Sequence, residues 1–373
     1  MTERLKIGFD AKRIVRNGTG LGSYGRTLVN DLASYPLELR LYAPDQGRDQ
    51  LRQQIRQQIR QQENVRFCYP APSHLPFSKA LWRSKGIVSD LKRDGIQVFH
   101  GLSGELPIGI RKSGIKSVVT IHDLIFLRHP EFYHWIDTKI YAWKFRQTLR
   151  EADHIIAISE CTRRDIMEYG GDLISEDRIS LIYQSCAPKF TVSRRAAPRE
   201  RYILSVGSIE ARKNILLAVK ALPYLPEELK LVIVGRHTPY TDEVSAYAEK
   251  AGLSHRIRIM HGVSDEALPR LYAEAEAFVY PSRYEGFGIP IIEAISCGLP
   301  VVACTGSCLE EAGGPDSLYV DPDDARAMAQ AIRQVLRGAE GREKRIENSQ
   351  QYIKRFAGND VAGQVAELYR SLL

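Results

Sequence analysis

The sequence has few cysteines, and their spacing excludes the usual cysteine-based sites. Six cysteines occur in 373 residues, without a CxxC pair and without a group of histidines beside them. Thiols spaced in this way are typical of reduced, buried side chains in a cytosolic protein. We therefore expect neither a structural zinc site nor a disulfide framework. The cysteines are Cys68, Cys161, Cys186, Cys297, Cys304 and Cys308.

Long hydrophobic runs are also missing. The longest candidate, residues 289–305, is interrupted by Glu293, Ser296 and Pro300, whereas spanning a bilayer takes roughly 18 or more apolar residues. Residues 1–6 lead directly into a short apolar strand, without the hydrophobic segment that a secretory signal needs. These absences predict a cytoplasmic protein.

Long runs of like charge are absent too, although the chain is basic overall. Lysine and arginine total 52 against 45 acidic residues, which gives a formal charge of +7, and the basic residues are scattered. That charge suits an anionic substrate, a membrane surface or nucleic acid, and the scatter argues against nucleic acid. The composition is that of a soluble globular protein, and the length exceeds one ordinary core, so we expect two domains.

Short apolar strands alternate with helical stretches along the whole chain. This order predicts an α/β protein with parallel sheets covered by helices, in which each half forms a doubly wound, Rossmann-like domain. Residues 188–201 are rich in proline and basic residues, which is typical of a linker. We expect domains over 1–187 and 202–359, facing a central cleft. The expected strands are Lys6–Asp10, Glu38–Tyr42, Val65–Cys68, Val98–His100, Ser117–Ile121, His154–Ile158, Ile179–Ile182, Tyr202–Val206, Lys230–Val234, Ile257–Met260, Ala277–Tyr280 and Pro300–Ala303.

The most informative segment lies between residues 280 and 294. Two acids, Glu285 and Glu293, are separated by seven residues that include Gly288 and Pro290. Pro290 predicts the start of a helix, whose free N–H groups favour a bound anion. The segment thus offers carboxylates that can bind hydroxyl groups beside backbone amides that can bind phosphate. A sugar nucleotide is a ligand that requires both.

A glycine-rich stretch follows the first strand and predicts a second ligand-binding turn. Gly20, Gly22 and Gly25 spell G-x-G-x-x-G, with a helix expected to begin near Ser23. Such a turn suits a phosphate or a hydroxyl-rich ligand. A nicotinamide dinucleotide is a competing ligand, although the acid that should follow the next strand fits only loosely at Asp45. A plain tight turn is the remaining alternative.

Two further segments place polar side chains where strands end. His122 and Asp123 follow an apolar strand, so His122 is a candidate for sugar contacts, with Asp123 as the neighbour that orients it. Arg212 and Lys213 follow the strand that opens the second half, where two fixed cations could stabilise a leaving diphosphate without a metal. A capping pair and an ordinary charged first turn are the alternatives.

Together these segments resemble the retaining glycosyltransferases of family 4, which have the GT-B fold. The resemblance covers nearly the whole chain and is strongest over residues 205–302. It implies that Arg212 and Lys213 bind the donor diphosphate and that Glu293 binds the ribose. It implies that Glu285 and His122 lie beside the sugar. The resemblance implies donor contacts through Gly20, Gly22, Gly207, Val263, Phe287, Gly288 and Ile289. One departure is Ser208, where many members of the family have an arginine.

The resemblance also implies the reaction. A hexose would move from a nucleoside diphosphate sugar to an acceptor hydroxyl of a glycan or lipid-linked glycan, with retention and without a metal or other cofactor. The segments look most like bacterial mannosyltransferases of surface polysaccharide synthesis, which favours GDP-mannose, with a glucose-type sugar as the alternative. Peripheral contact with the inner membrane face would follow, and a helix near Phe77 could supply it; a solvated helix that packs on the sheet is the alternative. The terminal helix, 360–373, would pack back on the N-terminal, acceptor-binding domain.

Three alternatives remain open at this point. A nucleotide-sugar epimerase would share the donor site and need no acceptor. A nicotinamide-dependent oxidoreductase would use the N-terminal glycine turn. A nucleotide-sugar binding subunit without activity would be expected to have lost some of Arg212, Lys213, Glu285 and Glu293.

Overall fold

The computed structural model divides the chain into two compact units. It describes residues 4–18, 20–49, 55, 59, 63–72, 77–191, 200–264, 266–356 and 359–373. Unit 1 comprises Met1–Gln184 and Asp360–Leu373, and unit 2 comprises Ser185–Asn359. The first unit therefore ends slightly before the predicted boundary at residue 187. The predicted linker, 188–201, belongs to unit 2, and its residues 192–199 lie outside the described part.

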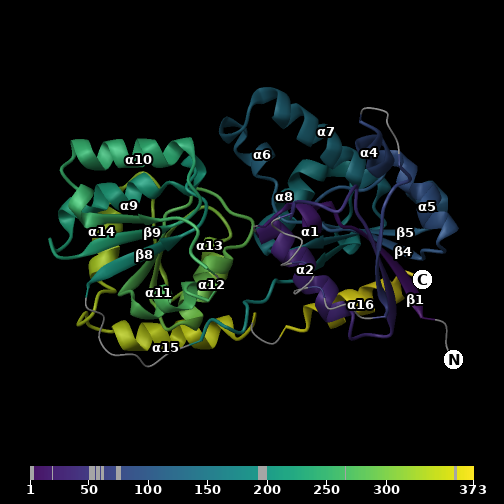
Figure 1. Cartoon of the computed structure of the whole chain (residues 1–373). Coiled ribbons are helices and arrows are strands. Elements are labelled where there is room, and N and C mark those ends of the chain that lie inside the picture. Colours follow the sequence, from purple (N-terminus) through teal and green to yellow (C-terminus); the bar gives the residue numbers. More distant parts are fainter. Residues whose placement is uncertain are drawn as a thin grey trace. The chain divides into compact units, whose positions relative to one another are not determined.

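Unit 1 is built on a seven-stranded parallel sheet of order β3-β2-β1-β4-β5-β6-β7. Helices cover both faces of this sheet, as a doubly wound fold requires (Figure 1). Its strands are β1 (Leu5–Asp10), β2 (Leu37–Tyr42), β3 (Val65–Cys68), β4 (Val98–Gly101), β5 (Lys116–Ile121), β6 (His154–Ala157) and β7 (Ile179–Leu181). Its helices are α1 (Lys12–Arg16), α2 (Gly20–Leu32), α4 (Ser78–Leu81), α5 (Ile87–Arg93), α6 (Ile125–Arg128), α7 (Trp135–Glu151), α8 (Glu160–Gly170) and α16 (Val361–Ser371).

The C-terminal helix α16 completes the core of unit 1. Figure 1 shows it beside α2, although more than 300 residues separate the two in the sequence. Tyr369 of α16 is fully buried, and its hydroxyl lies 2.6 Å from Nδ1 of His100 on β4. Nε2 of His100 lies 2.8 Å from the hydroxyl of Thr120 on β5. This buried polar chain joins the last helix of the sequence to the centre of the first sheet.

Unit 2 has a six-stranded parallel sheet of order β10-β9-β8-β11-β12-β13. Numbered within the unit, this is the order 3-2-1-4-5-6 of a Rossmann fold. Its strands are β8 (Tyr202–Val206), β9 (Lys230–Val234), β10 (Ile257–Met260), β11 (Ala277–Tyr280), β12 (Val301–Cys304) and β13 (Leu318–Val320). Its helices are α9 (Ile215–Ala221), α10 (Pro239–Lys250), α11 (Leu268–Glu274), α12 (Ile289–Ser296), α13 (Leu309–Gly313), α14 (Ala325–Arg333) and α15 (Arg342–Ile353).

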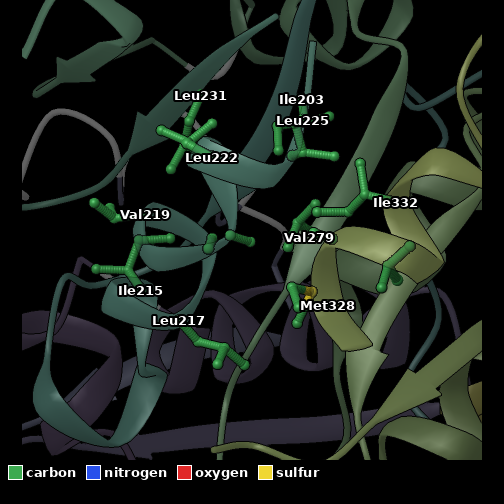
Figure 2. Packing of buried hydrophobic residues seen from close by; sticks show 14 of the residues in the cluster. Ile203, Ile215, Leu217, Val219, Leu222, Leu225, Leu231, Val279, Met328 and Ile332 are labelled. Carbon is green, nitrogen blue, oxygen red and sulfur yellow. The ribbon is translucent and has the colours of Figure 1, made fainter. Parts of the chain in front are cut away.

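Apolar side chains from the sheet and from the helices α9, α10 and α14 form the main core of unit 2. Figure 2 shows Leu217 of α9 and Met328 of α14 in this cluster, together with Val279 of β11. All three are buried, as the continuous apolar runs of the central strands predict. The packing fixes the ends of β8 and β11, which carry the candidate site.

The strands follow the sequence closely, and two helical details differ. All the expected strands form, and β13, which is only three residues long, was not expected. Helix α2 begins at Gly20 rather than near Ser23. Gly22 permits this early start, because a Cβ there would lie 1.8 Å from the carbonyl oxygen of Asn17. No helix in the described part of the chain has the length and apolar character needed to cross a membrane.

Candidate active site

The carboxyl ends of β8 and β11 form the natural ligand-binding edge of unit 2. These strands are neighbours, and the strand order reverses between them. In open α/β sheets, ligands bind at the carboxyl ends of strands at such a reversal. Lys213 follows β8, while Tyr280 ends β11 and Glu285 follows it. The fold therefore brings together side chains that are far apart in the sequence.

Lys213, Arg212 and Glu285 form one charged network at this edge. The ammonium of Lys213 pairs closely with Oε1 of Glu285 and donates a hydrogen bond to the Tyr280 hydroxyl at 2.7 Å. Nη1 of Arg212 lies 3.3 Å from Oε2 of the same carboxylate. The side chains of Lys213 and Glu285 are 13% and 10% exposed, so most of this network is removed from water.

Hydrogen bonds to the backbone fix the positions of the two loops that carry the network. A 3₁₀ turn, Ala211–Lys213, ends at Asn214, which has the left-handed φ of 53°. The Asn214 side chain holds this conformation by donating a hydrogen bond to the Pro322 carbonyl at 2.7 Å. The N–H of Arg283 donates to the Arg212 carbonyl at 2.9 Å. The loop that carries Glu285 is thus tied directly to the turn that carries the cations.

Burial and charge oppose each other in this network. Burial raises the pKa of Glu285, but Lys213 and Arg212 outweigh it and hold the pKa of this carboxyl below its usual value. Burial lowers the pKa of Lys213, and Glu285 partly offsets that effect. The carboxylate is therefore ionised at neutral pH, and each charge depends on the other.

Gly207 brings bare backbone close to the Lys213 side chain. It has a φ of 149°, and an added Cβ would lie 4.0 Å from the Lys213 ammonium. The carbonyl of Gly207 also lies against Gly235, where a Cβ would approach it to 2.0 Å. These close approaches leave a small cavity at the end of β8. It is lined by Ser205, Val206, Gly207, Ser208, Ile209, Lys213, Ile215, Ile233 and Tyr280.

Gly288 and Phe287 fix the loop that leads into α12. Gly288 has a φ of 103°, and an added Cβ would lie 3.2 Å from the Cβ of Ala312. Phe287 is buried, and its ring meets that of Phe356 edge-on at 5.3 Å. Helix α12 begins at Ile289, one residue before the predicted start at Pro290, so Pro290 is the second residue of the helix. The free N–H groups at this helix start are thus held in a fixed place.

Glu293 lies on α12 and has a different partner from Glu285. Its Oε2 accepts a hydrogen bond from the hydroxyl of Tyr272 at 2.9 Å. Tyr272 lies on α11 and is fully buried, which holds the carboxylate in one orientation. Val263 stands half-buried in the loop after β10, beside Gly262 with its φ of 66°. The two glutamates thus belong to one loop–helix segment but to separate hydrogen-bonded groups.

His122, in unit 1, is held by a carbonyl and an amide rather than by Asp123. Its Nε2 lies 2.9 Å from the Leu102 carbonyl, and Gln184 donates to its Nδ1 at 3.2 Å. Burial lowers the pKa of His122 to about 4, so the ring is neutral at physiological pH. The prediction that Asp123 orients His122 is wrong, because the Asp123 carboxylate accepts the N–H of Ile125 instead.

The predicted glycine turn differs from a dinucleotide fingerprint. In that fingerprint the first glycines form the turn before the helix. Here Gly20, Gly22 and Gly25 all lie within α2, and a Cβ on Gly25 would approach Ile14 to 2.9 Å. Gly22 and Gly25 therefore serve the close packing of α2 against the preceding segment. Gly20 has no atom within 4 Å of an added Cβ.

Comparison with known proteins identifies the family. Residues 18–186 match the sequence family described as Glycosyltransferase Family 4, and residues 189–352 match the one described as Glycosyl transferases group 1. The O-antigen chain mannosyltransferase B of Escherichia coli is 32% identical over 290 residues, which cover 74% of each chain. The chain belongs to glycosyltransferase family 4.

Other relatives of this glycosyltransferase agree with that assignment. The O-antigen chain mannosyltransferase RfbU of Salmonella typhimurium is 27% identical over 220 residues, which cover 59% of this chain and 61% of the relative. The solved structure of a sucrose-phosphate synthase from Thermosynechococcus elongatus aligns with a TM-score of 0.79 at 21% identity and covers 99% of both chains. The fold is therefore GT-B. None of these relatives supports an epimerase or an oxidoreductase.

Several residues of the candidate site were not predicted from the sequence. Tyr280 contacts the Lys213 ammonium through its hydroxyl, which accepts a hydrogen bond at 2.7 Å. Tyr280 could have been predicted, because it is the last residue of a strand, where ligand-binding side chains collect. Glu210 pairs with Arg212 at 3.3 Å, and Arg236 lies 3.8 Å from Glu210. Among the described residues, no group of three or more His, Cys, Asp or Glu side chains could hold a metal ion.

Proposed function

We propose that this glycosyltransferase moves a hexose, with mannose favoured over a glucose-type sugar, from a nucleoside diphosphate donor to a hydroxyl of a glycan or lipid-linked glycan. The reaction retains the anomeric configuration and uses no metal. The observation that carries the proposal is the buried network of Lys213, Arg212 and Glu285 at the reversal point of the unit 2 sheet. GDP-mannose is the favoured donor because the two bacterial relatives above are named as mannosyltransferases.

The network supports a role in the departure of the diphosphate. As the bond from sugar C1 to the phosphate oxygen breaks, negative charge grows on the diphosphate, and preorganised cations stabilise it. Lys213 and Arg212 supply these cations, helped by backbone N–H groups at Phe287, Gly288 and Ile289. Glu285 keeps both cations fixed before the donor arrives.

The remaining steps follow from a reaction on one face of the sugar. The acceptor oxygen forms the new bond to C1 on the side from which the phosphate leaves, and its proton passes to a phosphate oxygen. Glu293, oriented by Tyr272, holds the ribose hydroxyls. Glu285 and the neutral ring of His122 contact the sugar, and Gly20, Gly22, Gly207 and Val263 contribute donor contacts. Most of the proposed donor contacts belong to unit 2, and unit 1 binds the acceptor.

The place of the reaction follows from the acceptor. A lipid-linked glycan is confined to a membrane, so we propose that the protein acts at the inner membrane face through peripheral contact. Nucleic acid is not a partner in this proposal, because the basic residues are scattered along the sequence.

A thermal-shift panel tests the donor site. The panel contains GDP, UDP, ADP, GDP-mannose, UDP-glucose, UDP-N-acetylglucosamine and NADH, with the wild type and Lys213→Ala. A ligand that binds the folded state raises the melting temperature by mass action. We expect guanosine ligands to stabilise the wild type and to lose most of that effect in Lys213→Ala. Lys250→Ala, on the exposed surface of α10, is the matched control.

Each other outcome has a definite meaning. Stabilisation by uridine ligands alone would keep the transferase and replace the donor. Stabilisation by NADH alone would contradict the proposal, as would nucleotide binding that is unchanged in Lys213→Ala.

A further inference from the structure

Large apolar side chains gather on one exposed face of unit 1. Phe77 directly precedes α4 and Leu81 ends it, and Phe77 is 84% exposed. Trp135 and Trp143 of α7 are 63% and 57% exposed. We call this surface the α4–α7 face, and it comprises Phe77, Leu81, Trp135, Ile136, Ile140 and Trp143.

On α7 the spacing shows that the exposed residues form one helix face. Ile136 and Ile140 are four residues apart and Trp143 follows three residues later, so these side chains lie on one side of the helix. The opposite side of α7 packs against the core of unit 1, where Phe145 is buried. Helix α7 thus has two apolar faces, and among the described residues only one of them packs into a hydrophobic core.

Basic side chains are interspersed with the apolar ones. Lys139 lies over the ring of Trp135, with its ammonium 4.9 Å from the ring centre. Lys79 and Arg146 are exposed on α4 and α7, and Asp137 is the single exposed acid on α7. Lys79 also pairs with Asp45 at 3.2 Å. Long basic side chains can lie along apolar surface while their charges reach lipid head groups. The charge of the face is therefore complementary to an anionic membrane.

A cavity of about 910 Å³ opens beside this face. Phe77, Leu81 and Trp143 line it, and so do Lys12 and Arg83 from deeper in unit 1. It lies next to the carboxyl end of β1, because Asp10, the last residue of that strand, also lines it. A molecule held in a membrane by a lipid chain could enter such a cavity while its lipid stays in the bilayer.

We propose that the α4–α7 face docks the protein on an anionic lipid bilayer, with the cavity opening at the membrane surface. Tryptophan and isoleucine enter the interfacial region, and Lys79, Lys139 and Arg146 contact anionic head groups. A protein partner fits less well, because lysine is depleted at protein interfaces. This inference rests on the proposed function in one respect, that the acceptor is lipid-linked.

Vesicle binding tests the proposal on the full chain. The protein is sedimented with vesicles of phosphatidylcholine alone or of phosphatidylcholine with phosphatidylglycerol, at low and high salt. We expect strong binding only with phosphatidylglycerol, weakened by salt. Tryptophan emission should shift to shorter wavelength on binding, because Trp135 and Trp143 are two of only three tryptophans.

The decisive variant is the triple substitution Trp135→Gln, Ile136→Gln and Ile140→Gln. These residues do not line the cavity, and we expect the vesicle partition coefficient to fall about tenfold or more. Tyr247→Gln, at an exposed aromatic of α10 in unit 2, is the matched control and should bind like the wild type. Lys139→Glu should reduce binding to anionic vesicles, whereas Lys250→Glu should not.

Failure of this inference is distinguishable from failure of the proposed function. The nucleotide thermal shift is measured on every variant, and it should be unchanged in the triple variant. Equal sedimentation of wild type and triple variant would overturn the membrane proposal while the donor site stands. A lipid-free dimer that the triple variant converts to monomer would also overturn it, because a second copy would then be the occupant of this face.

Discussion

Removing the Lys213 ammonium should separate the structural role of the charged network from its catalytic role. Lys213→Met keeps the length of the side chain and leaves Glu285 buried without its nearest cation. Arg212 remains 3.3 Å from the other carboxylate oxygen and compensates in part. The variant therefore tests stability and activity through one charge.

The expected loss of stability follows from the burial of the pair. Breaking a buried ion pair costs roughly 3–5 kcal/mol, because the remaining charge is left uncompensated. With Arg212 still in place, we expect a loss of about 2–3 kcal/mol in the free energy of unfolding of unit 2. For a unit of this size that loss corresponds to roughly 5–10 °C in melting temperature.

The expected loss of activity has a separate cause. A fixed positive charge on the departing diphosphate acts in the transition state, and losing such a group costs on the order of 10²–10³ in kcat. The double variant Lys213→Met with Glu285→Gln removes both charges, so it should recover most of the lost stability. It should recover none of the activity.

Chemical denaturation and donor turnover measure the two effects. The reasoning would be refuted if Lys213→Met unfolded with a free energy within about 0.5 kcal/mol of the wild type, as a typical surface substitution does. It would also be refuted if the double variant regained activity, because Lys213 would then act only by neutralising Glu285.

Three further predictions concern other parts of the chain. Glu293→Gln should abolish the preference for GDP over 2′-deoxy-GDP in calorimetric titrations, because a charged hydrogen bond to the ribose is lost; an unchanged preference would exclude the ribose role. Burial lowers the pKa of His100 to about 3 from its usual 6.5. Below about pH 6.5, His100 is therefore protonated in the unfolded chain but stays neutral in the folded chain. His100 alone should therefore lower the free energy of unfolding by up to about 1.4 kcal/mol per pH unit between about pH 6.5 and 3. His122 adds a loss of the same sign down to about pH 4, so His100→Gln should remove only the share of His100 from the slope in denaturant titrations. Deleting residues 360–373 removes the buried Tyr369, so proteolysis should digest unit 1 while unit 2 still binds nucleotide; an intact unit 1 would show that α16 is dispensable.

The strands could be predicted from the sequence because buried parallel strands are continuous apolar runs. Val301–Cys304 and Ala277–Tyr280 are of this kind. Strand β13 could not be predicted in the same way, since Leu318–Val320 is too short to show a period. The start of α2 depends on the contact between Gly22 and the Asn17 carbonyl, which is a tertiary fact that no local pattern contains.

The candidate site could be predicted in its residue types but not in its pairing. Spacing and strand ends pointed to Lys213 and Glu285 separately, and only the adjacency of β8 and β11 joins them. The orientation of His122 by Leu102 and Gln184 was likewise beyond the sequence, because both partners are remote along the chain. Sequence neighbours such as Asp123 were a poor guide to side-chain contacts.

Hexosyl transfer itself is the most direct test of this account. The protein is incubated with GDP-mannose or UDP-glucose and a set of short glycosides, and products are analysed by mass spectrometry and NMR. The double variant Lys213→Met with Glu285→Gln is the blank. We predict a product heavier by one hexose, with the anomeric configuration of the donor, formed by the wild type alone. A linkage of inverted configuration, or equal product from the blank, would contradict the mechanism centred on Lys213 and Glu285.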